Sequence, residues 1–332
     1  MHKSKDFLMP LTGSQQSAPV AEPQGAPPLA PYHADLSAGL LARAAWISPK
    51  YFYDARGSAL FEQITRLPEY YPTRTEQQIM SAHGAAIAQA IAPGSTVIEW
   101  GAGNCAKAMQ LCALLQPARF VGLDISSDCL QAGAGRLQSA YPDMQVHACA
   151  ADLTADWTLP ADIPLARRVV YYPGSSIGNF APAQALELLQ RMRAMVEGDG
   201  ALLIGVDLVK PVPVLEAAYN DSTGVTAAFN SNVLSHVNQL MGSDFDEDDW
   251  AHRAFFNSRL SRIEMHLRAR HDVTVSWPGQ VRNFAHGECI HTENSYKYRA
   301  DGLAAWLGQA GFSRVQPWTD EQGWFAVVLA QP

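Results

Sequence analysis

Along residues 75–209, segments with the hydrophobic period of a helix alternate with short apolar runs typical of buried strands. Ser127 directly precedes one of the helical segments, and we expect its hydroxyl to cap that helix. Strands that alternate with helices of this length predict an α/β fold, in which helices cover both faces of a parallel sheet. The helical segments are 75–92, 106–116, 128–141 and 182–196, and the strand segments are 95–100, 119–125, 145–153, 167–175 and 201–209.

The alternation stops at Lys210. Two further helical stretches follow, and residues 260–277 then alternate between apolar and polar positions, which predicts a strand. Near the C-terminus a helical segment precedes two strand segments, 312–318 and 324–330, which we expect to form an antiparallel pair. The simplest account is a parallel-sheet domain interrupted by a second unit, which starts near residue 210 and ends near residue 289 or shortly after it.

The stretch CIHTENSYKY, residues 289–298, is a predicted strand with an unusual group of polar residues. Thr292, Glu293, Asn294 and Ser295 follow one another inside a segment that is otherwise apolar and aromatic. Buried polar side chains need hydrogen-bond partners, because leaving them unpaired away from water is costly. We therefore take this strand as a candidate for ligand recognition.

The composition is that of a large globular protein. The chain has 332 residues, 48% of them hydrophobic, which is enough for two domains or for one domain with a large insertion. Its net charge is −8 and it has no basic block, which disfavours binding to nucleic acid or to an anionic membrane. Residues 1–31 contain six prolines and few large apolar side chains, so we predict a disordered tail there.

The cysteines and the apolar segments indicate a protein of the cytoplasm. The five cysteines are odd in number, scattered, and never arranged as C-x-x-C, which is typical of reduced thiols. No apolar run approaches the roughly 20 residues that a membrane helix needs. The N-terminus also lacks the apolar core of a signal peptide. We expect a cytoplasmic monomer that binds neither nucleic acid nor membrane.

A glycine-rich loop between the first predicted strand and its helix is a candidate ligand site. In VIEWGAGNCAKA, Glu99 stands two residues before Gly101, and Gly103 follows. Glycine lets the backbone approach a ligand closely, and the helix N-terminus offers free N–H donors. Asp124 ends the second strand, where a carboxylate can accept both hydroxyls of an adenosine ribose, and Asp152 ends the third, where it can meet the adenine amino group.

The loop alone leaves the identity of the ligand open. The spacing G-x-G-x-x-A also fits a dinucleotide-binding fingerprint, and glycine turns between strand and helix occur without any ligand. The acid two residues before the first glycine and the closing antiparallel strand pair favour S-adenosylmethionine (SAM) over NAD. This preference rests on pattern and not on a physical argument.

Five longer stretches are more specific than the glycine loop. They are KYFYDARGSALFEQITRLPEYYPTRTE (50–76), GSSIGNF (174–180), DLVKPVPVLEAAYNDSTGVTAAFNSNVL (207–234), RIEMHLRAR (262–270) and HTENSYKY (291–298). Together they resemble the histidine-specific Nα-methyltransferases of ergothioneine biosynthesis, from about residue 35 to the C-terminus. The resemblance implies that SAM donates three methyl groups to L-histidine, through its mono- and dimethylated forms, to give the trimethylbetaine hercynine.

The resemblance also implies a fold with two domains. The SAM-binding domain is expected to be a Rossmann-like class I methyltransferase domain, with a parallel sheet and a C-terminal antiparallel strand pair, and to comprise residues 75–209 and 297–332. A second, α+β domain is expected to bind the substrate and to comprise residues 32–74 and 210–296. This division agrees with the break in the pattern at Lys210.

The binding residues of the family can be carried over to positions of this sequence. For SAM, the resemblance implies contacts from Gly101, Lys107, Asp124, Asp152 and Leu153. For histidine, it implies contacts from Tyr70, Gly174, Asn179, Tyr219, Met265, Glu293 and Ser295. Tyr53 is expected near the amine, through a water that makes it a candidate proton acceptor, and Tyr53 and Asn179 are the expected catalytic residues.

These residue types suit a histidine ligand. Glu293 can accept the ring N–H, while Ser295 and Tyr70 can donate to or accept from the other ring nitrogen. Asn179 and Tyr219 can donate to the substrate carboxylate without an arginine, so we expect no fixed positive charge at this site. Methyl transfer is a one-step displacement, so that alignment is expected to supply most of the catalytic effect.

Three departures from the family pattern and several alternatives stay open. The loop GAGNCAK has fewer hydroxyls than expected, a proline precedes Gly174, and Leu153 stands where an aromatic can occur, all of which affect cofactor affinity. The rival functions are methylation of another amino acid such as tryptophan, a SAM or amino-acid sensor without turnover, and an NAD-dependent oxidoreductase. The acidic run at 243–252 lacks the glycine and glutamate of an EF-hand loop, and the histidines form no zinc motif, so we expect no metal.

Overall fold

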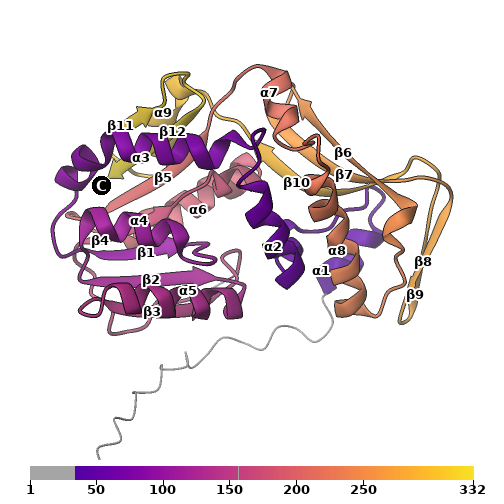
Figure 1. The fold of residues 1–332 in the computed structure, drawn as a ribbon, viewed down its shortest axis with the longest axis horizontal. Coiled ribbons are helices and arrows are strands. Elements are labelled where there is room, and N and C mark those ends of the chain that lie inside the picture. The colour runs from indigo at the N-terminus through magenta and orange to yellow at the C-terminus, as the bar shows by residue number, and fades with distance from the viewer. Residues whose placement is uncertain (1–33, 156) are drawn as a thin grey trace, which may run out of the picture.

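A seven-stranded sheet with its helices forms one lobe of the molecule, and a smaller antiparallel sheet with its helices forms the other (Figure 1). The computed structural model describes residues 34–155 and 157–332. The tail predicted for residues 1–31 lies outside the described residues.

The seven-stranded sheet has the strand order β11-β12-β5-β4-β1-β2-β3. Six of these strands run in the same direction, and β12 lies antiparallel between β5 and β11. The predicted α/β fold, with a parallel sheet and a C-terminal antiparallel strand pair, is therefore confirmed. The strands are β1 (Thr96–Trp100), β2 (Arg119–Asp124), β3 (Gln145–Ala150), β4 (Arg168–Tyr172), β5 (Ala201–Asp207), β11 (Arg314–Thr319) and β12 (Phe325–Gln331).

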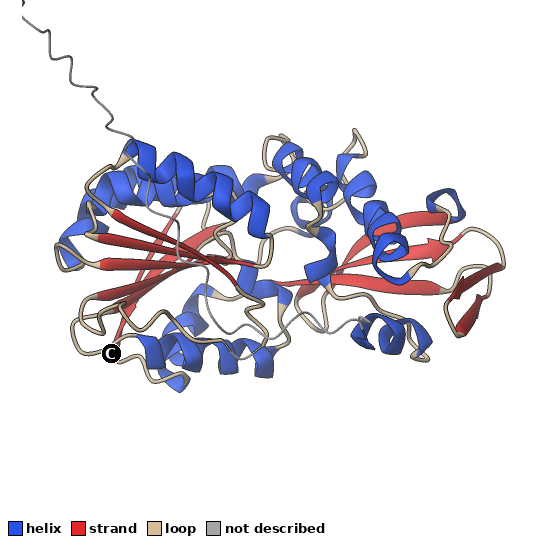
Figure 2. Cartoon of the chain, turned by 90° about the horizontal axis from the view of Figure 1, so that it is seen from below, coloured by secondary structure: helices blue, strands red, loops and turns tan. Residues whose placement is uncertain are grey.

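Helices cover both faces of this sheet (Figure 2). On one face, α3, α4 and α5 bury apolar residues that include Ile79, Leu111 and Leu137. On the other face, α6 and α9 contribute Leu189 and Leu307. These helices are α3 (Tyr71–Ala90), α4 (Ala106–Leu115), α5 (Ser127–Ala140), α6 (Pro182–Met195) and α9 (Leu303–Gln309), with the short 3-10 helices η2 (Ser176–Asn179) and η4 (Ala300–Gly302). Within the described part of the chain, no helix combines the length and the apolar character needed to cross a membrane.

The start of α5 differs from the prediction. Ser127 is the first helical residue, and Ser126 stands at the cap position without a side-chain capping bond. The backbone N–H of Ser126 instead donates to Asp124 Oδ1 at 2.8 Å. The capping role expected of Ser127 is wrong, because Ser127 is already the first residue of the helix and Ser126 stands at the cap position.

The second lobe packs α8 against a three-stranded antiparallel sheet of order β10-β7-β6. Residues 260–277, predicted to form a strand from their alternation, contain β7 and β8, and β8 pairs with β9 in a separate hairpin. The elements are α1 (Ala34–Leu41), η1 (Pro49–Phe52), α2 (Ala55–Ile64), α7 (Val212–Ala217), α8 (Val225–Met241), η3 (Glu247–Asp249), β6 (Trp250–Asn257), β7 (Arg262–Ala269), β8 (Val273–Trp277), β9 (Gln280–Phe284) and β10 (Cys289–Tyr296).

The hydrophobic residues form separate cores in the two lobes. The core of the smaller lobe takes its buried residues from 36–71 and 215–290. The larger lobe has a core on each face of its sheet, built from 79–208 and 303–330. Helix α3 belongs to both lobes, because Tyr71 at its start lies in the first core and Ile79 lies in the second. The domain boundaries expected near residues 75, 210 and 297 stay a prediction.

The chain passes between the lobes in two neighbouring segments. Leu208, after β5, forms an isolated bridge with Tyr298, after β10. The backbone N–H of Val209 donates to the Tyr298 carbonyl at 2.9 Å, and the N–H of Tyr298 donates to the Asp207 carbonyl at 2.9 Å. The end of β5 and the end of β10 are thereby held side by side.

Candidate active site

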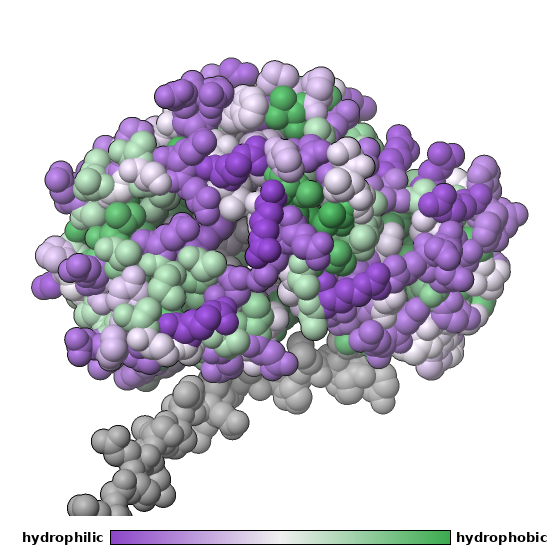
Figure 3. Space-filling model, in the orientation of Figure 1, coloured by the Kyte–Doolittle hydropathy of each residue, from purple (hydrophilic) through white to green (hydrophobic). Residues whose placement is uncertain are grey.

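A cavity of about 930 Å³ lies between the two lobes. The molecule is visibly hollowed there, and both hydrophilic and hydrophobic residues border the hollow (Figure 3). One wall comes from the residues at the carboxyl ends of β1, β2, β3 and β4, and the facing wall comes from η1, α2 and β10. This is the edge at which open α/β sheets bind ligands.

A smaller cavity of about 60 Å³ adjoins the first. Several residues line both cavities. The two cavities are therefore close enough for a ligand in one to contact a ligand in the other. The shared residues are Tyr53, Phe61, Tyr70, Gly174, Ser176, Asn179 and Glu293. The other walls of the small cavity include Tyr219, Met265 and Ser295.

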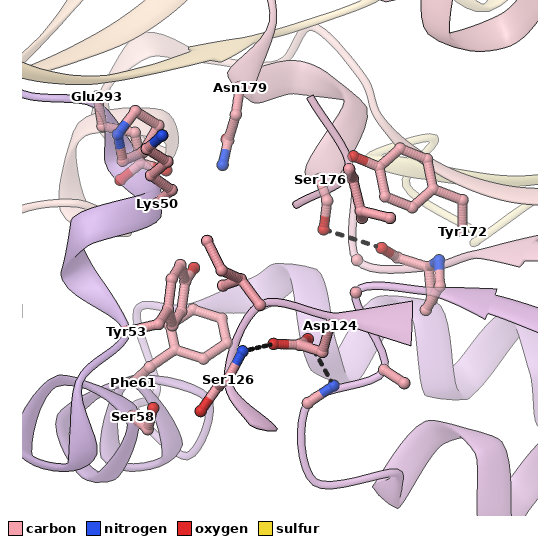
Figure 4. Close-up of a pocket in the computed structure, with 18 of the residues that line it drawn as sticks. Lys50, Tyr53, Ser58, Phe61, Asp124, Ser126, Tyr172, Ser176, Asn179 and Glu293 are labelled. Atoms are coloured by element: carbon pink, nitrogen blue, oxygen red, sulfur yellow. Dashed lines mark hydrogen bonds between the residues drawn. The ribbon is translucent and has the colours of Figure 1, made fainter. Parts of the chain in front are cut away.

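The turn from β1 to α4 brings backbone close to the large cavity. Gly101 and Gly103 have φ angles of 72° and 50°, in the left-handed region that favours glycine. Asp124 holds this turn, because its carboxylate accepts the backbone N–H groups of Gly103 and Ser126, each at 2.8 Å (Figure 4). Burial raises the pKa of Asp124, although these donors oppose the shift. Asp124 is therefore a fixed acceptor at the cavity wall.

Asp152 and Leu153 follow β3 and line the same cavity. The Asp152 carboxylate accepts the backbone N–H of Thr154 at 2.9 Å and lies 3.4 Å from Lys50 Nζ. Lys50 comes from the other lobe and also pairs with Asp35 at 3.0 Å. Burial alone would raise the pKa of Asp152, but Thr154 and Lys50 outweigh it and lower the pKa. Asp152 is thus an ionised acceptor that also links the lobes.

An ion pair between a buried carboxylate and a partly exposed lysine stands beside the glycine turn. Lys107 Nζ on α4 lies 2.6 Å from Glu76 Oε2 on α3, and the Glu76 side chain is only 5% exposed. The other Glu76 oxygen accepts the N–H of Gly174 at 2.8 Å. Gly174 has a φ of 76°, and a Cβ at this position would lie 2.7 Å from Lys107 Nζ. Glu76 therefore fixes both the lysine and the loop after β4.

Glu293 reaches the wall shared by the two cavities from a bulge in β10. The pairing of β10 with β7 shifts between His291 and Glu293, and Glu293 lies opposite Met265. Burial raises the pKa of Glu293 to about 7, against a smaller opposing effect of Lys297. In the amide orientation that its surroundings require, Asn179 Nδ2 donates to Glu293 Oε1 at 3.2 Å. Figure 4 shows both residues at the cavity, with Tyr53 and Phe61 facing them from α2 and the segment before it.

Aromatic rings surround the small cavity. The Phe61 ring meets the Tyr53 ring edge-on at a centroid distance of 5.8 Å and the Tyr70 ring at 6.3 Å. The Tyr219 ring lies 6.4 Å from the Tyr70 ring. Burial raises the pKa of all three tyrosine hydroxyls well above the ordinary value. At neutral pH they are uncharged hydrogen-bonding groups on rings whose faces attract cations.

Residues 32–332 match the family described as histidine-specific, SAM-dependent methyltransferases. The chain belongs to this family. The histidine N-alpha-methyltransferase of Mycolicibacterium smegmatis is 41% identical to it over 303 residues, which cover 89% of this chain and 93% of that protein. The protein of the same name from Mycobacterium tuberculosis is 40% identical over 303 residues, with 89% and 93% covered. Ergothioneine biosynthesis protein 1 of Schizosaccharomyces pombe is 30% identical over 258 residues, which cover 74% of this chain and 33% of that one.

The large cavity of this methyltransferase suits SAM, the methyl donor of the family. Glu99 at the end of β1 lines it, and its Oε2 has no hydrogen-bond partner among the described residues. Burial raises the pKa of Glu99 well above the ordinary value, although Lys107 opposes the shift. An unpaired carboxyl oxygen can accept a hydrogen bond from an ammonium or hydroxyl group of SAM. The position of Glu99, two residues before Gly101, is the sequence signal for a site residue.

The structure brings the predicted site residues of the methyltransferase together. Those predicted for SAM all line the large cavity, and those predicted for histidine all line the small one, while Tyr53 lines both. Their individual roles stay predictions. The first set is Gly101, Lys107, Asp124, Asp152 and Leu153, and the second is Tyr70, Gly174, Asn179, Tyr219, Met265, Glu293 and Ser295.

The expectation that no fixed positive charge stands at the substrate residues is wrong. Lys297 Nζ lies 2.7 Å from Ser295 Oγ and 3.1 Å from Tyr219 OH. It also forms an ion pair with Asp207 Oδ2 at 2.7 Å. The sequence offered one signal for this lysine, which stands two residues after Ser295 and so extends from the same side of the chain if the strand continues.

A cluster of possible metal ligands lies on the face of the small sheet opposite Met265. Candidate ligand atoms of Glu264, His266 and His291 lie within 4.8 Å of one another. The sequence motifs missed this cluster, because its residues come from two strands that pair only in the fold. Arg262 donates to Glu264 Oε1 at 2.8 and 2.7 Å, and His266 Nε2 lies 3.0 Å from Glu264 Oε2. Because this carboxylate is already paired on both oxygens, we assign the cluster no metal.

Proposed function

We propose that this protein transfers three methyl groups, one at a time, from SAM to the α-amino group of L-histidine. The product is hercynine, Nα,Nα,Nα-trimethyl-L-histidine, and the reaction is the first step of ergothioneine biosynthesis. Mono- and dimethylhistidine are then the successive substrates of a cytoplasmic, monomeric enzyme. The five cysteines are all free, which supports a reducing compartment.

One observation carries this proposal: the small cavity lined by Glu293 and Ser295 shares seven lining residues with the large cavity beside the glycine turn. A donor that fills the large cavity and an amino acid that fills the small one would meet at the wall that both share. Methyl transfer requires this contact, since the amine, the methyl carbon and the sulfur must align.

Glu293 supports histidine as the amino acid. Its carboxylate accepts the ring N–H, and Ser295 lies within the same cavity to bond the other ring nitrogen. A leucine or phenylalanine side chain would leave Glu293 without a partner, at a cost of roughly 1–3 kcal/mol or more. Tryptophan has one ring N–H but no second ring nitrogen, and its larger ring needs more space beside Met265.

The residues on the shared wall support the transfer step. Asn179 holds the Glu293 carboxyl group beside the substrate, and the neutral Tyr53 hydroxyl bonds the amine or a water next to it. Because burial keeps Tyr53 protonated, it acts as a hydroxyl and not as a phenolate base. The faces of Phe61 and Tyr70 stabilise the cation that forms as methyl groups accumulate on nitrogen. SAM supplies the methyl group, and the chain supplies alignment and an enclosed site.

A mass-spectrometric competition assay tests the proposal. The purified protein is incubated with SAM and an equimolar mixture of the common amino acids, without added metal. We expect histidine alone to gain one, then two, then three methyl groups. Methylation of a different amino acid would overturn the assignment of Glu293 and favour the tryptophan-like alternative. Binding of SAM without any methylation would favour a sensor without turnover.

A further inference from the structure

Lys297 is a buried lysine at the point where the chain leaves β10 and returns to the larger lobe. Its side chain is 0% exposed. Its ammonium group donates to Ser295 Oγ at 2.7 Å, to Tyr219 OH at 3.1 Å and to Asp207 Oδ2 at 2.7 Å. An ammonium has three N–H donors, so these three acceptors use all of them. Two of the three acceptors are hydroxyls that line the small cavity.

The lysine limits what the two hydroxyls can do. Tyr219 OH and Ser295 Oγ also bond each other at 2.7 Å. Each hydroxyl has one proton and two acceptor positions. Lys297 fills one acceptor position on each, and their mutual bond uses one proton and one further acceptor position. The pair is left with a single proton and a single acceptor position for a ligand, so Tyr219 and Ser295 cannot both donate to it.

Three charged side chains lie behind the hydroxyl pair. Asp207 at the end of β5 faces two lysines, Lys297 and Lys210, and the side chains of Asp207 and Lys210 are each 1% exposed. Burial alone would raise the pKa of Asp207, but Lys297 first and Lys210 next outweigh it and lower the pKa. The carboxylate is therefore ionised, and it forms ion pairs with both lysine side chains. Lys297 is the member of this group that touches the cavity hydroxyls.

We infer that Lys297 is a specificity-determining positioning residue, which orients the Tyr219 and Ser295 hydroxyls so that they offer one donor, backed by positive charge, to the amino-acid substrate. A ligand rich in acceptors, such as the carboxylate and ring nitrogen of a polar amino acid, is favoured over an apolar one. This inference rests on the proposed function, because it concerns the substrate cavity of the same reaction.

Lys210 provides a matched control. It is equally buried, pairs with the same Asp207 carboxylate, and donates to Tyr71 OH at 2.8 Å and to the Leu208 carbonyl. Its ammonium group bonds Tyr71, Asp207 and Leu208, and not Tyr219 or Ser295, among the described residues. If the cluster only held the two lobes together, Lys297→Met and Lys210→Met would have the same consequences.

The experiment compares Lys297→Met and Lys210→Met in the full-length protein. We expect both to lower the melting temperature, because each removes one partner of a buried ion cluster. Lys297→Met should raise the KM for the amino acid by about 10- to 100-fold, with the affinity for SAM changed less than about twofold. Lys210→Met should change this KM by less than about threefold. Equal KM changes in the two variants, or equal loss of SAM and amino-acid binding in Lys297→Met, would overturn the inference.

A double-mutant cycle with Ser295→Ala tests whether the lysine acts through the hydroxyl. Lys297→Met should raise the KM of Ser295→Ala by a smaller factor than it raises the wild-type KM, because one of the two hydroxyls that it orients is already gone. Full additivity would overturn the inference. If Lys297→Met does not fold, Lys297→Gln, which keeps one polar donor group, is measured in its place with the same expectations.

The amino acid used is the one that the wild-type protein methylates in the competition assay. If that amino acid is not histidine, the proposed function fails while the comparison of Lys297 with Lys210 can still be made on the actual substrate. If histidine is methylated but the two lysine variants behave alike, only the inference about Lys297 fails.

Discussion

Asn179 and Glu293 meet across the two lobes: Asn179 Nδ2 in η2 donates to Glu293 Oε1 in β10 at 3.2 Å. The same nitrogen donates to the backbone carbonyl of Asn294 at 3.2 Å. One amide on the sheet side thus holds the carboxyl group that faces the small cavity. Glu293 also borders the large cavity, but its bonded partner is Asn179 and not a residue predicted for SAM, so a change at Glu293 is expected to affect the amino-acid site more than the SAM site.

Replacing the carboxylate by an amide should weaken histidine binding selectively. Glu293→Gln keeps the shape of the side chain but removes the negative charge that accepts the ring N–H. We expect a loss of about 10- to 100-fold in histidine affinity by calorimetry, with SAM affinity changed less than about twofold. Asp124→Asn serves as the converse control, which should weaken SAM and spare histidine. Parallel losses of both ligands in Glu293→Gln would refute the assigned role.

The pH dependence of histidine turnover should report the Glu293 carboxyl. Its pKa in the folded protein is about 7, so it is neutral below that pH and ionised above it. We expect kcat/KM to rise with pH through about 7, as the acceptor for the ring N–H forms. Deprotonation of the substrate amine contributes a further rise in the same direction. In Glu293→Gln the component near pH 7 should disappear, and a profile identical to the wild type would contradict the assignment.

The same raised pKa affects stability with a defined sign. Because the folded-state pKa of Glu293 lies above the unfolded value of about 4.5, the folded protein holds this proton more tightly. Any stabilisation from the protonated group is complete below about pH 4.5 and is lost as the pH rises to about 7. The melting temperature of Glu293→Gln should therefore rise relative to that of the wild type as the pH increases from about 4.5 to about 7. A difference in melting temperature between Glu293→Gln and the wild type that stays constant across this pH range would contradict the raised pKa of Glu293.

Gly174→Ala should affect both stability and SAM binding, whereas Gly224→Ala should affect stability alone. The two glycines have φ angles of 76° and 77°, so alanine suffers the same backbone strain of about 1 kcal/mol at either position. Only at position 174 would the new Cβ lie 2.7 Å from Lys107 Nζ, while the Cβ at 224 meets nothing within 4 Å.

We expect Gly174→Ala to push Lys107 away from Glu76 and to lower SAM affinity about tenfold, as measured by calorimetry. Gly224→Ala should show a similar drop in melting temperature and an unchanged SAM affinity. Equal SAM affinities in the two variants would show that the position of Lys107 does not matter for the cofactor.

Tyr53→Phe should slow the reaction only modestly. The phenylalanine ring can keep the edge contacts with Phe61 and Phe229, whose centroids lie 5.8 and 6.0 Å from the Tyr53 ring. Since burial holds the Tyr53 hydroxyl protonated, only a hydrogen bond is lost, and kcat should fall less than about tenfold. A loss of about 10²- to 10⁴-fold, together with a missing pH limb, would instead identify Tyr53 as the general base.

Much of the fold and of the candidate site could be predicted from residues that are near one another in the sequence. The hydrophobic period changes from that of a strand to that of a helix at the glycine turn and near the acids at the ends of β2 and β3. This change can be seen directly in the sequence. The resemblance to the family then assigned Glu293 and Asn179 to the substrate site. Hydrophobic periodicity alone would not make that assignment. Ser127 shows the limit of placing a helix boundary from a pattern, because the helix begins at Ser127 itself, one residue before the predicted start.

The sequence by itself determined the alternating elements, the glycine turn and the strand that carries Glu293, since each depends on side chains that are near neighbours along the chain. Only the tertiary structure decided which charges stand behind that strand. Tyr219 and Ser295 are separated by 76 positions, and Lys297 and Asp207 approach only where the segments after β5 and β10 run side by side. Hydrophobic periodicity cannot predict a buried ion pair of this kind. Its partners are far apart in the sequence and come close together, away from water, only once the lobes have packed.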